Sequence, residues 1–297
     1  MNLQTPLVSI SVVTYQHKNY IKQCLDGILM QQTTFSFEII LGEDESKDGT
    51  REICIDYANK YPDKIKLFLR NRNNVIYING NATGRYNFIE NLKSTKGKYI
   101  ALCEGDDYWT DPLKLQKQVD FLEANPDFVI CFHKVKVLTK TEGLVDDFIT
   151  EDRFNKIKEF PITQKSLFDY SNFIHTPSVM FRNIIKDYPL EFELSPIGDY
   201  LLYFVLTNNG YIHRIENVMA VYRYGNGIYS KLIDKEKNKI GLKFQICLLS
   251  YTNSDYIKKR IIKNLYNKIN YNEKKNVDNL TTKKLLKLII KRIKKYF

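Results

Sequence analysis

The first half of the chain alternates between short apolar segments rich in β-branched residues and segments with helical spacing. The apolar segments predict strands at residues 7–14, 37–42, 65–69 and 98–103. The intervening segments predict helices at residues 19–32, 48–61 and 86–94. Such alternation is typical of a parallel sheet with helices on both faces. We therefore predict a Rossmann-like α/β fold.

The second half continues with less regular elements. We predict a helix from Pro112 to about Ala124, a charged flexible insertion at 140–162, and a short strand at Ser178–Phe181. A longer strand at Phe128–Leu138, a helix at 199–208 and a strand or strand pair at 211–224 are also expected. From about Lys231 onward the sequence predicts lysine-rich helices with few glycines or prolines.

The positive charge is concentrated in the C-terminal part. Residues 231–297 hold 19 of the 45 lysines and arginines but only 5 of the 34 acidic residues. The body is therefore near neutral, which argues against nucleic acid and favours an anionic surface or partner for the tail. Five widely spaced cysteines without a C-x-x-C pair suggest free buried thiols in a reducing compartment. With no signal-like or spanning segment, we expect a cytoplasmic protein.

Ligands of open parallel sheets bind at the carboxyl ends of the strands, and the residues there are strongly acidic. Glu43-Asp44-Glu45 follows the second predicted strand, and Glu104-Gly105-Asp106-Asp107 follows the fourth. Clustered carboxylates repel one another, so a hard divalent cation is a natural partner for the second group. The alternative is an acidic turn before the helix that begins near Asp111-Pro112.

Taken in order, these stretches resemble the family 2 glycosyltransferases, which have the GT-A fold. The resemblance covers about residues 7–230. The matching segments are VSISVVTY at 8–15, EDxSxDGT at 43–50, GKYIALxExDD at 97–107, KLxxQ at 114–118 and GDY at 198–200.

The resemblance implies a role for particular residues on the nucleotide side. Thr14 and Tyr15 would border the nucleoside, and Asp44 would bind the base or ribose with Glu43 beside it. A carboxylate suits this role because it accepts hydrogen bonds from imide and hydroxyl donors. Arg85 resembles the arginine of the family that approaches the nucleotide, and its alternative is a surface charge at a helix start.

The resemblance also assigns the chemistry. Glu104 and Asp106 occupy the family's D-x-D signature, so Asp106 would bind a divalent metal, Mn²⁺ or Mg²⁺. The glutamate departs from the signature, and Glu104 would reach the ribose or the metal through water. Asp199 matches the catalytic base, and its place near a helix N-terminus favours the ionised form. Some relatives have a histidine soon after the position of Arg223, and here there is none.

The resemblance implies an inverting, metal-assisted transfer from a nucleotide-diphosphate sugar, with UDP favoured, to a hydroxyl of a glycan or lipid-linked acceptor. Residues 1–230 would form the GT-A domain, with the nucleotide sugar bound by about 1–125 and the acceptor by 126–230. Surface polysaccharide or lipopolysaccharide assembly is the expected pathway. A nucleotidyltransferase, or a degenerate transferase that only binds nucleotide sugars, remains as an alternative.

Two features beyond the transferase pattern carry further predictions. In residues 281–297, lysines and apolar side chains fall on opposite helical faces, as in helices that lie on membranes. We expect this tail, within a helical basic region at 231–297, to hold the enzyme at an anionic membrane surface, or else to pack on its own domain. His175 either lines the acceptor side or is structural, whereas His133 and His213 fall in strand patterns and are expected to be structural.

Overall fold

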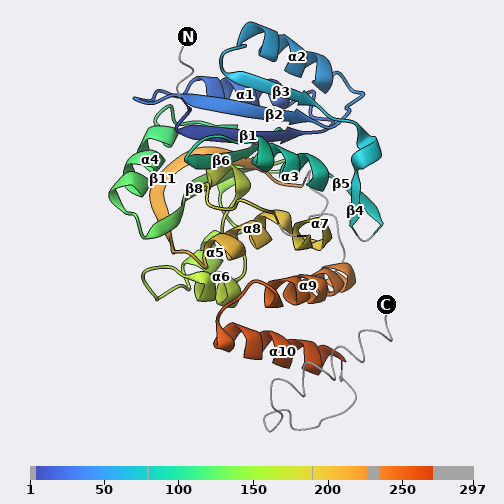
Figure 1. The fold of residues 1–297 in the computed structure, drawn as a ribbon, viewed down its shortest axis with the longest axis vertical. Helices are drawn as coiled ribbons and strands as arrows, with labels where there is room; N and C mark the ends of the chain where they lie inside the picture. Colours follow the sequence, from blue (N-terminus) through green and yellow to red (C-terminus); the bar gives the residue numbers. More distant parts are fainter. Residues whose placement is uncertain (1–4, 79, 189, 226–233, 270–297) are drawn as a thin grey trace.

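The computed structural model describes residues 5–78, 80–188, 190–225 and 234–269. It confirms an α/β fold with a large sheet, helices on both of its faces and two further helices after the sheet (Figure 1). The predicted amphipathic segment at 281–297 lies outside the described residues. None of the helices in the described ranges is long and apolar enough to cross a membrane.

The N-terminal strands form the parallel half of the sheet. They are β1 (Val8–Thr14), β2 (Phe37–Glu43), β3 (Ile65–Leu69) and β6 (Tyr99–Glu104), in the spatial order β3-β2-β1-β6. All three contacts between them are parallel, as the alternating pattern predicted. Parallel pairing brings the carboxyl ends of these strands to one edge of the sheet.

The second half of the sheet is mixed. It continues from β6 in the order β10-β8-β11-β7, and β9 also pairs with β8. Of these contacts, β8 and β11 run parallel, whereas β10 runs antiparallel to both β6 and β8. The bounds are β7 (Tyr108–Trp109), β8 (Phe128–Thr139), β9 (Gly143–Asp146), β10 (Met180–Arg182) and β11 (Tyr211–Arg223). A separate hairpin pairs β4 (Ile76–Ile78) with β5 (Asn81–Thr83).

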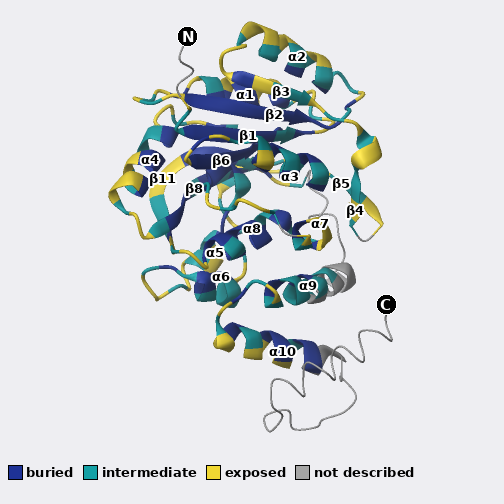
Figure 2. Cartoon of the chain, viewed as in Figure 1, coloured by how far each residue is buried: buried dark blue, intermediate teal, exposed yellow. Residues whose placement is uncertain are grey.

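The helices divide between the two faces of the sheet because side chains alternate along each strand. Val8, Ile10 and Val12 of β1 pack with α1, α2 and α4 in one apolar cluster, and Ile100 and Leu102 of β6 face the other cluster. Figure 2 shows the strands between these layers as mostly buried. The described helices of the N-terminal half are α1 (Ile21–Leu29), α2 (Thr50–Lys60), α3 (Arg85–Ser94) and α4 (Lys114–Ala124).

The second apolar cluster includes the C-terminal helices. Phe244 and Leu248 of α9, together with Ile257 and Ile261 of α10, are buried in the same cluster as α8. Figure 1 shows α9 and α10 layered beneath α8 on the side away from β1. The remaining helices are α5 (Glu151–Phe154), α6 (Gln164–Tyr170), α7 (Glu191–Leu194), α8 (Gly198–Leu206), α9 (Asp234–Leu249) and α10 (Asp255–Ile269).

Most predicted elements are confirmed, with differences at residues 140–182. The segment predicted as a flexible insertion contains β9 and α5. The strand β9 is ordered because it pairs with the end of β8. The predicted strand at 178–181 begins two residues later, after a 3₁₀ turn at Thr176–Ser178. All five cysteines are free thiols, as expected, and four of them are buried.

Two buried asparagines fix α3 to the carboxyl ends of β1 and β2. Asn87 Nδ2 donates to the Gly42 carbonyl at 2.8 Å, and Asn91 Nδ2 donates to the Val12 carbonyl at 2.9 Å. Arg70 in turn donates to the Oδ1 atoms of both asparagines. A Cβ atom at Gly42 would overlap these Oδ1 atoms, so only glycine leaves room for the network.

This network predicts a stability difference between two glycines. Gly42→Ala should lower the free energy of unfolding by about 1–3 kcal/mol, because overpacking displaces hydrogen-bonded side chains. Gly84→Ala is the matched control, since nothing lies within 4 Å of the added Cβ atom there. Urea denaturation of both variants measures the difference. Equal stabilities would contradict the predicted role of Gly42.

Candidate active site

The carboxyl ends of β1, β2 and β6 meet in register at one edge of the sheet. Thr14 is paired with Glu43, and Val13 is paired with Glu104. The turns that follow these strands therefore lie side by side, as the strand order predicted. This edge gathers the polar groups that the sequence singled out.

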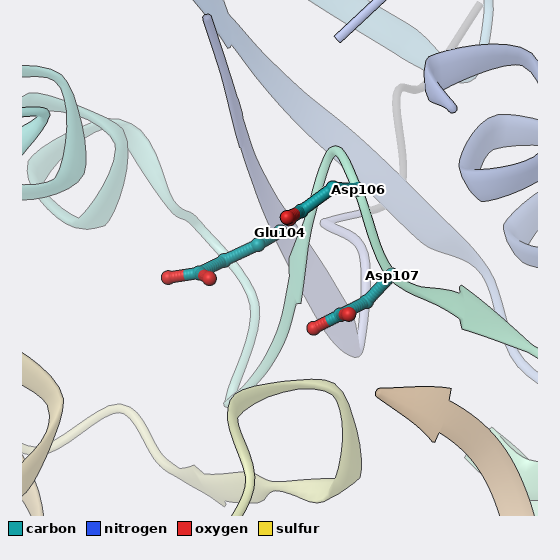
Figure 3. A group of neighbouring side chains, drawn as sticks. All are labelled: Glu104, Asp106 and Asp107. Carbon is teal, nitrogen blue, oxygen red and sulfur yellow. The ribbon is translucent and has the colours of Figure 1, made fainter. Parts of the chain in front are cut away.

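The acidic cluster consists of Glu104, Asp106 and Asp107 on the turn between β6 and β7. One carboxylate oxygen from each lies within 4.8 Å of the others. Figure 3 shows all three carboxylate groups directed to the same side of this turn. Burial, and then the charges of Asp106 and Asp199, raise the pKa of Glu104 to about 8. Burial and the charges of Asp106 and Glu104 raise the pKa of Asp107 well above its usual value.

The donor set of this cluster fits a divalent cation. Asp107 Oδ1 accepts from the Arg223 backbone N–H at 2.8 Å, but its buried Oδ2 has no hydrogen-bond partner among the described residues. A buried carboxylate oxygen without a partner is costly, and oxygen ligands are those that Mn²⁺ and Mg²⁺ accept. Arg223 lies against one side of the acidic cluster, where its guanidinium donates to the Asp106 carbonyl and to Gln23 Oε1.

The turns after β1 and β3 place an exposed aromatic ring beside a charged pair. Tyr15 is 39% exposed, and the Arg72 guanidinium lies 4.0 Å from the centroid of its ring. Arg72 Nη1 also forms an ion pair with Asp44 Oδ2 at 2.6 Å. Burial raises the pKa of Asp44, and Arg72 opposes this shift. The group thus offers a flat surface and a carboxylate to a planar ligand with N–H donors.

Two of the predicted nucleoside residues have partners within the protein. The Glu43 carboxylate accepts from the backbone N–H groups of Ser46 and Glu45 and from Arg51, so it shapes the turn after β2. Thr14 is buried, and its Oγ1 lies 3.3 Å from His17 Nδ1. For both residues a direct contact with the nucleoside stays a prediction.

Asp199 lies in the first turn of α8, near the acidic cluster. Its carboxylate accepts from Asn172 Nδ2 at 3.2 Å, and its charge contributes to the raised pKa of Glu104. Burial raises the pKa of Asp199, against backbone N–H groups and Arg85, which lower it. Burial, and then the charges of the acidic cluster and Asp199, raise the pKa of Tyr222. The candidate base and the candidate metal ligands therefore share one site.

Arg85, the first residue of α3, points toward the segment before α8. Its Nη1 donates to the carbonyls of Phe192 and Ser195, the latter at 2.9 Å. The side chain is buried, and burial lowers its pKa to about 10. The contact of Arg85 with the nucleotide stays a prediction, because its observed partners are backbone carbonyls in the segment before α8.

His175 forms a buried hydrogen-bonded pair with Asp147. Its Nε2 is 3.1 Å from Asp147 Oδ2, and both side chains are 8% exposed. The His175 ring packs on Tyr222 with centroids 4.6 Å apart, so it supports a wall of the site. The contacts of the other two histidines fit the structural roles expected for them. His133 is buried with its Nδ1 beside the Lys134 carbonyl, and the ring of His213 stacks on Phe121.

Two residues of the site carried no assigned role in the sequence. Arg72 pairs with Asp44, and Asn172 contacts Asp199. Arg72 follows β3, so the strand-end rule applied to that strand would have found it. Asn172 follows a short helix far from Asp199 in sequence, and no local pattern signals their contact.

A mostly parallel sheet with an acidic cluster at its carboxyl edge is typical of the GT-A class of glycosyltransferases, and comparison with known proteins agrees on this fold. The chain matches the model of Glycosyl transferase family 2 over residues 9–189 and belongs to that family.

Among curated relatives, an uncharacterized protein of Mycobacterium tuberculosis is 34% identical over 232 residues, which is 77% of this chain. This chain covers 63% of that relative's length, less than two thirds of it. The UDP-Glc:alpha-D-GlcNAc-diphosphoundecaprenol beta-1,3-glucosyltransferase WfaP of Escherichia coli is 28% identical over 263 residues, which is 85% of this chain and 95% of WfaP.

Solved structures share the fold at low identity. S. aureus TarS, residues 1–349 in complex with UDP, has a TM-score of 0.59 at 16% identity and covers 92% of this chain and 75% of its own. The mannosyltransferase PcManGT from Pyrobaculum calidifontis, in complex with GDP-Man and Mn²⁺, has a TM-score of 0.55 at 14% identity. That match covers 87% of this chain and 68% of PcManGT.

The raised pKa of Glu104 makes stability depend on pH. Between its ordinary pKa of 4.5 and the folded value of about 8, the folded state holds a proton that the unfolded state has lost. Stability therefore falls as the pH rises through this range. In EDTA, Glu104→Gln removes a carboxylate that is buried beside other carboxylates. The melting temperature at pH 8 should therefore rise, by roughly 2–4 °C for each kcal/mol gained in the free energy of unfolding.

The control for this variant is Glu52→Gln on the exposed side of α2, which should change nothing. Added Mn²⁺ should raise the melting temperature of the wild type by mass action and that of Glu104→Gln by less. Differential scanning fluorimetry across pH, with and without Mn²⁺, gives both readings. An undiminished Mn²⁺ shift in Glu104→Gln would argue against Glu104 as a ligand.

The Asp147–His175 pair gives a second stability prediction. Burial alone would raise the pKa of Asp147, but hydrogen bonds from His175 and Thr150 lower it. Asp147→Asn should therefore cost about 1–3 kcal/mol at neutral pH. Because the folded pKa is lowered, this contribution is fully present above the ordinary aspartate pKa of about 3.9 and disappears only below it.

Asp146→Asn is the matched control, since the neighbouring side chain of Asp146 is 94% exposed. It should change the free energy of unfolding by less than about 0.5 kcal/mol. Urea denaturation at pH 7 and at lower pH measures both variants. Equal effects of the two substitutions would show that the buried Asp147–His175 hydrogen bond contributes nothing to stability.

Proposed function

We propose that the chain is an inverting, metal-assisted glycosyltransferase that moves a sugar from a UDP-sugar to a hydroxyl of a glycan or lipid-linked acceptor. The observation that supports this most is the half-buried Asp199 carboxylate, which shares one site with the acidic cluster of Glu104, Asp106 and Asp107. A single displacement needs a base on one side of the sugar and charge neutralisation on the other.

For the donor, we propose that Tyr15 and Arg72 contact the base while Asp44 accepts its N–H group. Thr14 and Glu43 hold the turns on which these residues lie. TarS was solved with UDP and UDP-GlcNAc, and PcManGT with GDP-Man, so nucleotide sugars bind to this fold in both cases. The preference for uridine is part of the proposal.

For the metal, we propose that Asp106 is the principal ligand, with Asp107 and Glu104 beside it. The bound Mn²⁺ or Mg²⁺ would neutralise negative charge on the diphosphate leaving group. Arg223 holds the turn in place, since it donates to the Asp106 carbonyl through its guanidinium and to Asp107 through its backbone.

For the acceptor, Asp199 would take the proton of the attacking hydroxyl. A base must be ionised, and the backbone N–H groups at the start of α8, Arg85 and Asn172 all favour the charged form. The hydroxyl then attacks the anomeric carbon from the side opposite the diphosphate, which inverts the configuration. This route needs no covalent intermediate on the protein.

WfaP is named for a diphosphoundecaprenol acceptor, and we propose an acceptor of this lipid-linked kind, in surface polysaccharide or lipopolysaccharide assembly. The lysine-rich tail would then keep the enzyme at the inner face of an anionic membrane, and co-sedimentation with anionic and neutral vesicles tests this part. The nucleotidyltransferase alternative is weaker because the turn after β1 lacks a glycine-rich, basic phosphate loop.

A donor screen tests the proposal. UDP-, GDP-, dTDP- and CMP-sugars are incubated with the full chain and Mn²⁺, and the released nucleotide is measured without and with undecaprenol-linked acceptors. Release from UDP-sugars that stops in EDTA is expected. Formation of a nucleotide sugar from a sugar phosphate would identify a nucleotidyltransferase, and binding without release would identify a degenerate transferase.

Replacement of the base gives a sharper prediction. Asp199→Asn should lower kcat by about 10²–10⁴-fold, because the amide keeps the shape but accepts no proton. The dissociation constant of UDP should remain that of the wild type. Asp187→Asn, at an exposed position, is the control and should keep full activity. Weaker UDP binding with unchanged kcat would place Asp199 in the nucleotide site instead.

A further inference from the structure

Arg85 connects helix α3 with the segment that precedes α8. It begins α3, which Asn87 and Asn91 fix to the backbone of β1 and β2. Its guanidinium, however, donates to the carbonyls of Phe192 and Ser195, more than a hundred residues further along the chain. These partners lie at the end of α7, directly before the helix that carries Asp199.

The two carbonyls need a donor. They lie at the C-terminal end of a short helix, where carbonyl groups lack partners within the helix, and a cation there also matches the helix dipole. Phe192 and Ser195 are fully buried, so water does not reach them. Arg85 satisfies both carbonyls with one nitrogen, and this fixes the path of the chain into α8.

Gly198 shows how closely the guanidinium fits. A Cβ atom at Gly198 would lie 2.6 Å from Arg85 Cζ and 2.7 Å from Nη2. The backbone immediately before Asp199 therefore rests against the guanidinium. Nothing in this packing depends on a nucleotide, and the positive charge also favours the ionised carboxylate of Asp199.

From these contacts we infer that Arg85 is a positioning residue for the base Asp199, anchored to the donor side through α3, rather than a residue that binds the nucleotide. The inference rests on the proposed role of Asp199. In this arrangement Arg85 holds the end of α7, and Gly198 lets the first turn of α8 lie against the arginine. Loss of either shifts Asp199 relative to the acidic cluster.

The decisive experiment separates catalysis from donor binding. In Arg85→Met, kcat with the best donor from the screen should fall by about 100-fold, the cost of moving a catalytic group by about 1 Å. The dissociation constant of UDP with Mn²⁺, measured by calorimetry, should equal that of the wild type. Arg72→Met is the matched control, and there UDP binding should weaken by about tenfold because the charged pair with Asp44 is lost.

Gly198→Ala provides a second variant that keeps the arginine. It should also lower kcat without changing UDP affinity, and its loss of stability should vanish when Arg85 is replaced by alanine, since the clash is then removed. Weaker UDP binding in Arg85→Met would overturn the inference. Additive effects of Gly198→Ala and Arg85→Ala on the free energy of unfolding would overturn it as well.

Hydrogen–deuterium exchange keeps the test independent of the reaction. In Arg85→Met, residues 191–200 should exchange faster while α1 is unchanged, and unchanged exchange at 191–200 would overturn the positioning role. If the donor screen finds no transfer at all, the proposed function fails, whereas the exchange and the stability coupling still decide whether Arg85 holds this segment.

Discussion

Repulsion among closely spaced carboxyl groups at one edge of the sheet is the constraint around which the rest of the site is arranged. Glu104 ends β6, Asp106 and Asp107 follow on the next turn, and Asp199 adds a fourth carboxyl group from α8. Such a group is tolerated only when cations and hydrogen-bond donors surround it. Arg223 supplies part of this compensation, and a divalent cation fits the remainder.

The parallel strands explain why these groups meet. Because β1 pairs with β2 on one side and β6 on the other, three turns emerge at the same edge. The pair of Asp44 and Arg72 follows β2 and β3, and the acidic cluster lies at the end of β6. The two groups therefore lie along the same edge of the sheet, with the turn after β1 between them.

The two sides of the molecule are held together by packing and by a few buried polar contacts. The apolar cluster on one face of the sheet joins α3 and α8 to the C-terminal helices α9 and α10. Arg85 and the asparagines of α3 add directional bonds where the cluster reaches the site. Directional bonds restrict the position of a side chain more than apolar contacts do, which is what a catalytic base requires.

The sequence by itself determined the alternating fold, its parallel half and the acidic residues at the strand ends, because periodicity and strand order are local properties. Its motifs also suggested the family, and the match to the family model confirmed that membership. Only the tertiary structure decided that Arg72 faces Tyr15, that Asn172 reaches Asp199, and that Arg85 binds the segment before α8. These contacts join residues far apart in the chain, and a side chain's partner across such a distance follows from packing, which no local pattern encodes.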